Sequence, residues 1–233
     1  MNTIEKNKQL LLVTIKALEK VINYQRSDYT KKSYQMCKEE GSYPFIPIST
    51  SRSLNDFIML RNILYGDISN IRSSKIHNIR KIWEDNISDN KNRMFIDAGC
   101  GIGNVMLLAR ATDLCYDIHG IEYFHDTYQK ALNWLGIEKG GKYEHYEIFK
   151  ENILDFDKYS AYDIIYYYRP FENMKLQSEF ERIVEDNMKV GAVLIPRLKK
   201  RIKEIQRDSR FISIFEFGRG IEPIYIKIKN WIK

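Results

Sequence analysis

The segment "MFIDAGCGIGN", residues 94–104, places three glycines within five positions directly behind an apolar run. Gly99, Gly101 and Gly103 carry no Cβ, so the backbone there can turn sharply and approach a ligand closely. Turns of this kind hold dinucleotides, nucleoside triphosphates or S-adenosylmethionine. The residues around the glycines must distinguish among these three ligands.

The neighbours of the glycines argue against phosphate-containing ligands. A Walker loop needs Lys and then Ser or Thr after its last glycine, whereas Asn104 and Val105 follow here. The dinucleotide fingerprint spaces its last glycine three positions away, whereas Gly103 comes two positions after Gly101. Asp97 would repel a pyrophosphate, but it can orient the loop and pair with an ammonium group. The pattern therefore favours S-adenosylmethionine.

Polar and aromatic side chains follow the next two expected strands. Glu122 comes nineteen residues after Gly103, where a carboxylate can accept hydrogen bonds from both hydroxyls of an adenosine ribose. Tyr123 offers a flat face for adenine, and Asn152 can bond the adenine edge. Because the ligand crevice of an open parallel sheet lies at the carboxyl ends of its strands, we expect these side chains to surround one ligand.

Expected strands alternate with expected helices from about residue 91 onward. The strands are "MFIDAG", "YDIHGIE", "KYEHYEIFKENI", "YDIIYYYR" and "KVGAVLIP", and the helices cover residues 103–112, 125–136 and 174–188. This alternation predicts an α/β fold with a mostly parallel sheet. The segments "RFISIFEF" and "IEPIYIKIK", joined by "GRG", predict a C-terminal antiparallel hairpin.

The residues before this sheet are predicted to be mainly helical. An apolar stripe over residues 4–24 indicates an amphipathic helix, and the Pro- and Ser-containing stretch 27–52 indicates a loop or strap. We therefore divide the chain into an N-terminal helical region and substrate lid, residues 1–90, and a ligand-binding domain, residues 91–233.

Two further helices are expected within the N-terminal region. Ser53 with Asp56 three positions later has the pattern of a capping box, which predicts a helix that ends near Gly66. The apolar spacing in "SSKIHNIRKIWEDN", residues 73–86, predicts another helix.

Composition places the chain among globular proteins that have no membrane span. The hydrophobic fraction is 44%, the charged fraction is 29% and the net charge is +6, which permits an anionic partner. Cys37, Cys100 and Cys115 form no CxxC pair, so we expect a reducing cytoplasm and neither a disulfide framework nor a zinc site. The histidines show no ligand spacing, and no metal is expected.

These motifs resemble those of class I, Rossmann-like S-adenosylmethionine-dependent methyltransferases over roughly residues 90–230. "FIDAGCGIGN" is similar to their first motif, "GIE" to their ribose-binding acid, "ENILDFD" to their adenine-side motif and "YDIIYYYRPF" to the motif beside the transferred methyl group. The resemblance implies methyl transfer from S-adenosylmethionine. It also implies a set of cofactor-binding residues: Asp97, Gly99, Gly101, Gly103, Asn104, Glu122, Tyr123, Asn152 and Ile153.

The residues that leave the fourth strand are the expected wall of the methyl-acceptor site. Tyr168, Arg169, Pro170 and Phe171 occupy the positions where relatives that methylate base amino groups carry Asn or Asp, then Pro, Pro and an aromatic residue. Tyr168 and Arg169 are the candidate catalytic residues, and Arg169 can pair with a carboxylate or phosphate. Tyr168 replaces the amide and Arg169 the first proline, so the acceptor atom stays open.

Other functions remain compatible with the sequence. RNA or protein is favoured slightly over a small molecule as the acceptor, since the chain is basic and a short stretch is similar to Rossmann-type histone-lysine methyltransferases. A non-catalytic RNA- or protein-binding module on the same fold is the main alternative. An NAD(P)-binding oxidoreductase is the third, and the glycine spacing counts against it.

Overall fold

The computed structural model describes residues 50–67, 69, 73–87, 93–112, 114–135, 137, 142–143, 145–214 and 223–230. The predicted helix over residues 4–24, most of the strap and the "GRG" turn lie outside the described residues, as does the part of the proposed lid before Thr50.

The described strands form one eight-stranded sheet, in the order β3-β4-β2-β1-β5-β6-β8-β7. Its centre is a run of parallel strands: β4 (Tyr146–Phe149), β2 (Asp117–Ile121), β1 (Met94–Ala98), β5 (Ile164–Tyr168) and β6 (Val193–Arg197). The antiparallel strands lie at the edges: β3 (Lys142–Tyr143), β8 (Tyr225–Lys227) and β7 (Phe211–Ser213). The predicted parallel sheet with a C-terminal antiparallel hairpin is confirmed.

The strand order reverses direction between β1 and β5. From β1 the chain builds outward through β2 and β4, and it then returns to the other side of β1 with β5 and β6. The connections after β1 and β5 therefore leave the sheet on opposite sides, and open α/β sheets bind their ligands at such a reversal. The residues that follow Ala98 and Tyr168 are therefore where a ligand site is expected in this fold.

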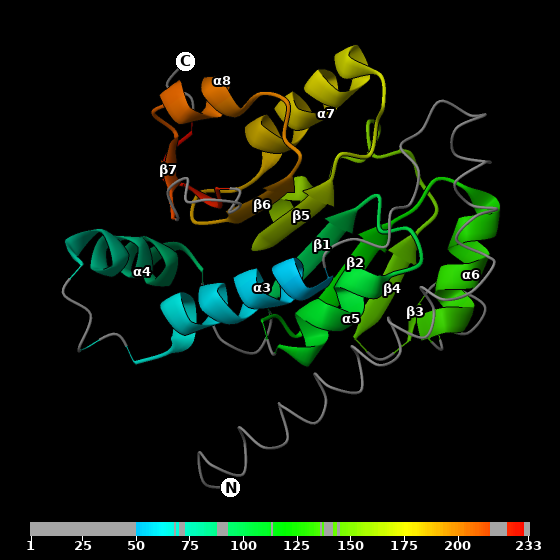
Figure 1. The fold of residues 1–233 in the computed structure, drawn as a ribbon, viewed down its shortest axis with the longest axis horizontal. Helices are drawn as coiled ribbons and strands as arrows, with labels where there is room; N and C mark the ends of the chain where they lie inside the picture. The colour runs from blue at the N-terminus through cyan, green and yellow to red at the C-terminus, as the bar shows by residue number, and fades with distance from the viewer. Residues whose placement is uncertain are drawn as a thin grey trace, which may run out of the picture.

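Helices cover both faces of the sheet (Figure 1). One face carries α3 (Thr50–Tyr65), α4 (Ser74–Asn86), α5 (Asn104–Ala111) and α6 (His125–Leu135), whose apolar side chains share a core with Phe95 and Tyr166. The other face carries the 3-10 helix η1 (Tyr159–Ala161), α7 (Met174–Asn187) and α8 (Ile202–Arg207), which pack with Ile96 and Tyr167. Successive residues of β1 and β5 alternate between these two cores because strand side chains alternate.

Helix α3 is part of the core of the sheet domain. The ring of Phe57 packs edge-on against Phe95 and Tyr166, with centroids 5.8 and 5.9 Å apart. Trp83 of α4 is 1% exposed in the same core. Helices α3 and α4 therefore cannot leave the sheet without exposing a large apolar surface.

The predicted capping box at Ser53 is wrong. Helix α3 begins at Thr50, so Ser53 lies inside the helix, where its hydroxyl is 3.3 Å from the Tyr166 hydroxyl. Asp56 forms a buried ion pair with Arg197 at the end of β6. These polar side chains bond to distant strands rather than to the helix terminus, and a local pattern cannot distinguish the two uses.

Two other parts of the fold differ from prediction. The predicted strand over residues 142–153 is a short antiparallel pair, β3 with β4, and β4 already ends at Phe149. The alternation of polar and apolar residue types continues from β3 into β4, so the sequence resembles one longer strand. Helix α8 was not predicted, because its six residues bury a single apolar side chain, Ile205.

Lys227 caps the C-terminal end of α7 from the neighbouring strand β8. Its ammonium group donates hydrogen bonds to the carbonyl oxygens of Glu185, Asp186 and Met188 at 3.1, 3.1 and 2.7 Å. The side chain is 1% exposed, so these carbonyl oxygens have little access to water.

Replacing Lys227 by Met should lower the free energy of unfolding by about 2 kcal/mol, because carbonyl groups at the helix end lose a charged donor. Urea denaturation monitored by circular dichroism measures the loss. The exposed Lys229 provides the control: Lys229→Met should change stability by less than about 0.5 kcal/mol. Equal effects of the two substitutions would contradict the capping role.

Candidate functional site

The glycine loop leaves β1 in a conformation that favours glycine. Gly99, Gly101 and Gly103 have φ values of +82°, +56° and +84°, in the left-handed region that L side chains rarely adopt. The amides of Gly99 and Cys100 both donate to the carbonyl oxygen of Ile121, at 3.0 and 2.9 Å. The loop is therefore fixed against the end of β2, and α5 begins directly after Gly103.

Glu122 contacts this loop directly. Its Oε2 accepts a hydrogen bond from the Gly101 amide at 3.0 Å, and its Oε1 accepts one from the Phe124 amide at 2.9 Å. Each carboxylate oxygen can still accept a second bond. Burial raises the pKa of Glu122 to about 7, although these backbone donors act in the opposite direction.

Asp97 is a second buried acid beside the loop. The carboxyl group is 2% exposed, and both burial and the negative charge of Glu122 raise its pKa well above the ordinary range. Within the part of the chain that the structure describes, neither a hydrogen-bond donor nor a cation offsets these two effects. A ligand that brings a positive group to Asp97 would relieve this cost.

Asn104 adds an unsatisfied acceptor at the first turn of α5. Its side chain is 4% exposed, and among the described residues none donates a hydrogen bond to its Oδ1. Buried polar atoms are normally hydrogen-bonded, so an unpaired one beside a glycine loop is typical of a ligand contact. Asp97 and Asn104 thus fit the ammonium group of an amino-acid ligand.

The three predicted adenine-side residues differ in their surroundings. Tyr123 is 63% exposed, and its ring lies 5.4 Å from that of Phe124. Asn152 lies beyond the end of β4, and its Oδ1 accepts a hydrogen bond from the Leu154 amide at 3.1 Å, as in an Asx turn. Ile153 is 6% exposed within the apolar core. Their contact with adenine stays a prediction.

The predicted acceptor wall begins where β5 ends. The Arg169 amide donates to the carbonyl oxygen of Arg197 at 3.1 Å, and Arg169 has an unusual φ of +26°. Pro170 lies so close to the glycine loop that a Cβ at Gly99 would be 3.2 Å from its Cβ. Phe171 follows, and its amide donates to Gln177 Oε1 at 3.1 Å. The wall and the glycine loop are therefore adjacent at the point where the strand order reverses.

Three residues beside this wall were not predicted from the sequence. Gln177 and Glu181 of α7 are both 0% exposed, and Leu198, after β6, is 38% exposed with a φ of +51°. Polar residues at four-residue spacing on the apolar face of α7 were a usable signal, because such a face is normally apolar throughout. Nothing in the sequence distinguishes Leu198 from other loop residues.

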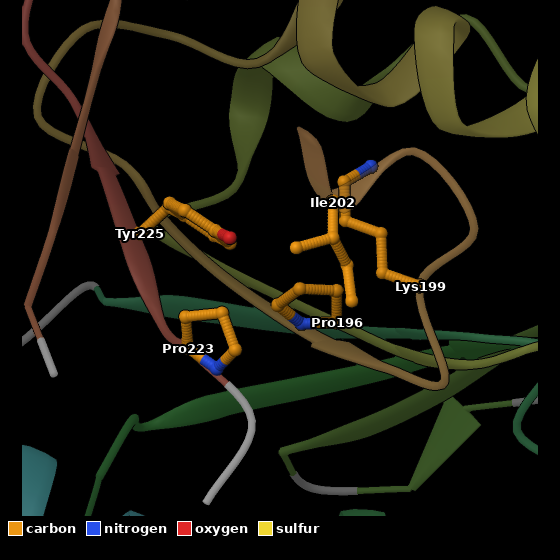
Figure 2. Close-up of a pocket in the computed structure, with 5 residues that line it drawn as sticks. All are labelled: Pro196, Lys199, Ile202, Pro223 and Tyr225. Atoms are coloured by element: carbon orange, nitrogen blue, oxygen red, sulfur yellow. The ribbon is translucent and has the colours of Figure 1, made fainter. Parts of the chain in front are cut away.

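A narrow crevice lies beside β6 and β8, next to the loop that contains Lys199 (Figure 2). It is lined by Pro196, Lys199, Ile202, Pro223 and Tyr225, and it is too tight to admit a water molecule. None of the predicted cofactor or acceptor residues lines this crevice, so it does not compete with the loop beside Glu122 as a ligand site.

Comparison with protein-family models and with curated proteins gives no match. Among solved structures, a methyltransferase from Geobacter sulfurreducens gives a TM-score of 0.50 at 14% identity, over 87% of this chain and 92% of that one. A candidate methylase from Haemophilus influenzae also gives 0.50 at 14% identity, over 77% and 99%. An rRNA methylase from Streptococcus thermophilus gives 0.44 at 16% identity, over 68% and 99%.

The similarity to the first two of these structures shows that the chain has the fold of Rossmann-like methyltransferases. Among its described helices, none has the length and apolar character that crossing a membrane requires.

Proposed function

We propose that the protein is a methyltransferase that uses S-adenosylmethionine. One observation carries the proposal: the Glu122 carboxylate touches the glycine loop at Gly101, with the buried acid Asp97 beside both. These groups lie at the carboxyl ends of β1 and β2, next to the point of strand reversal where this fold class binds ligands.

The residues fit the different parts of this cofactor. Asp97 and Asn104 would hold its ammonium group, and the glycine loop would lie along its amino-acid portion. Glu122 would accept hydrogen bonds from the two ribose hydroxyls. We infer that Tyr123 and Asn152 contact adenine, and that Ile153 lines the adenine side.

A dinucleotide fits this site less well. The acids Asp97 and Glu122 are both buried within interaction range of each other, and a pyrophosphate near them would add two further negative charges. An ammonium group instead neutralises charge there. The buried pair therefore argues against an NAD(P)-binding oxidoreductase.

Methyl transfer requires mainly position and electrostatics from the protein. When bound, the cofactor supplies an electrophilic methyl group. We propose that Tyr168 and Arg169 hold the acceptor at the end of β5, with Pro170 and Phe171 completing the wall. The Arg169 guanidinium would pair with a phosphate or carboxylate of the acceptor.

We infer that the acceptor is RNA or protein and that the protein acts in the cytosol. The net charge of +6 favours an anionic macromolecule. The buried thiols of Cys100 and Cys115 are free, which suits a reducing compartment.

Methyl-labelled S-adenosylmethionine incubated with the protein and a cell extract tests the proposal. We expect label in the RNA or the protein fraction. Label in the small-molecule fraction would show that the acceptor is a small molecule and not RNA or protein. Binding of S-adenosylhomocysteine without transfer to any fraction would favour a non-catalytic binding module instead.

A further inference from the structure

Helix α7 carries a stripe of buried polar side chains toward the sheet. Gln177, Glu181 and Glu185 follow one another at four-residue spacing and are 0%, 0% and 2% exposed. Residues at this spacing lie on one face of a helix. Burial of such groups costs free energy unless hydrogen bonds satisfy them, so their partners show what the stripe does.

Gln177 connects the stripe to the proposed acceptor wall. Its Oε1 accepts the hydrogen bond from the Phe171 amide at 3.1 Å, and its Nε2 donates to Glu181 Oε1 at 2.9 Å. Both ends of the amide are therefore used, which fixes its orientation.

Glu181 connects the same stripe to the loop after β6. Its Oε1 accepts from the Lys200 amide at 2.8 Å, and its Oε2 accepts from the Arg201 amide at 2.9 Å and from Lys199 Nζ at 3.1 Å. Lys199 also pairs with Glu185. Figure 2 shows the Lys199 nitrogen directed toward α7 while its aliphatic stem lines the crevice.

The two loops held in this way contain the two described non-glycine residues with positive φ. Arg169 (+26°) follows β5, and Leu198 (+51°) follows the neighbouring strand β6. The Arg169 amide bonds to the carbonyl oxygen of Arg197, directly before Leu198. Such backbone conformations persist only where surrounding contacts enforce them. Gln177 and Glu181 bond to the residues that follow them in each loop, Phe171 in the first and Lys199, Lys200 and Arg201 in the second.

We propose that Gln177 and Glu181 are positioning residues that hold the loops 169–171 and 198–201 together as one acceptor-binding wall. Leu198, which is 38% exposed, then forms an apolar part of that wall. This inference rests on the proposed function, because it assigns the substrate side of the same site.

Replacing Gln177 by Leu tests the connection with little change in volume. The Phe171 amide loses its acceptor and Glu181 loses a donor. Amide hydrogen exchange, measured by NMR on the cofactor-free full chain, should become at least about 10-fold faster at Phe171, Lys200 and Arg201. Transfer of labelled methyl into the cell extract should fall at least about 10-fold, while the Kd for S-adenosylhomocysteine stays within about twofold.

Asn187→Ala is the matched control on the same helix. Asn187 is exposed, and its side chain donates only to the Ile183 carbonyl among the contacts that the structure describes. This substitution should leave exchange at Lys200 and Arg201 and the transfer rate unchanged. If Gln177→Leu behaves like this control, the positioning role is overturned.

Gln177→Glu provides a second readout that does not depend on the Leu variant folding. A protonated Glu at position 177 can still accept a hydrogen bond from the Phe171 amide and donate one to the Glu181 carboxylate. An ionised Glu there would repel the Glu181 carboxylate. The transfer rate of this variant relative to wild type should therefore rise as the pH falls from 8 to 6. A ratio independent of pH would contradict the proposal.

The outcomes separate this inference from the proposed function. Wild-type protein that binds no S-adenosylhomocysteine would refute the methyltransferase proposal. The assignment of the wall to a methyl acceptor would then fail as well. Intact binding with unchanged exchange at Lys200 and Arg201 in Gln177→Leu would overturn the positioning role alone.

Discussion

Replacing Glu122 by Ala is expected to weaken the binding of S-adenosylhomocysteine at least about 100-fold. Two hydrogen bonds from ribose hydroxyls to an ionised carboxylate would be lost, each with a typical value of about 1.5–3 kcal/mol. The Gly101 amide would also lose its 3.0 Å bond to this side chain, so the loop would be held less firmly. Calorimetric titration at pH 8 measures the change in Kd.

The exposed Glu179 on α7 provides the control for this substitution. Glu179→Ala removes the same charge far from the glycine loop in sequence and should change the Kd by less than about twofold. A Glu122→Ala variant that folds and binds with wild-type affinity would exclude Glu122 as the ribose-binding residue.

Cofactor affinity should fall at least about 10-fold for each pH unit below 7. The pKa of Glu122 in the free protein is raised to about 7 by burial, whereas hydroxyl donors of a bound ribose would lower it. Above pH 7 the carboxylate is already ionised, and below pH 7 a proton must leave on binding. Asp97 acts in the same direction, because its raised pKa would be lowered by the cofactor ammonium group.

Titrations with S-adenosylhomocysteine between pH 8 and pH 5.5 measure this dependence. Glu122→Gln removes one of the two titrating groups and should make the profile less steep, although its affinity at pH 8 is lower. A wild-type Kd that stays constant over this range would show that neither buried acid contacts the ligand.

The stability of the cofactor-free protein should depend on pH in the opposite direction. A carboxyl group whose pKa is higher in the folded protein than in the unfolded chain binds more protons when folded. The free energy of unfolding therefore decreases as the pH rises from about 4.5 to 7, the window set by the ordinary and raised pKa of Glu122. The buried acids thus destabilise the free fold and favour the form with bound cofactor.

The cofactor side of the site was predictable because its signals are local. The left-handed glycines follow directly from the spacing of Gly99, Gly101 and Gly103. Glu122 was placed correctly, at the end of β2, because strands of a parallel sheet end at the same edge. Its contact with Gly101 then follows from the neighbouring positions of β1 and β2.

The acceptor side depends on contacts between distant parts of the chain. Asp56 pairs with Arg197, and Gln177 bonds to Phe171, yet each side chain resembles an ordinary helix residue in the sequence. The positive φ of Leu198 is likewise imposed by its surroundings rather than by its residue type. Periodicity and local motifs contain no information about such partners, so this half of the site required the structure.

Calorimetric titration of the folded wild-type chain at pH 8 with S-adenosylhomocysteine, and separately with NAD, tests the central claim most directly. The arrangement of Asp97, Glu122 and the glycine loop predicts saturable binding of one S-adenosylhomocysteine per chain and no binding of NAD. Binding of NAD, or no binding of S-adenosylhomocysteine by folded protein, would contradict the proposed cofactor site.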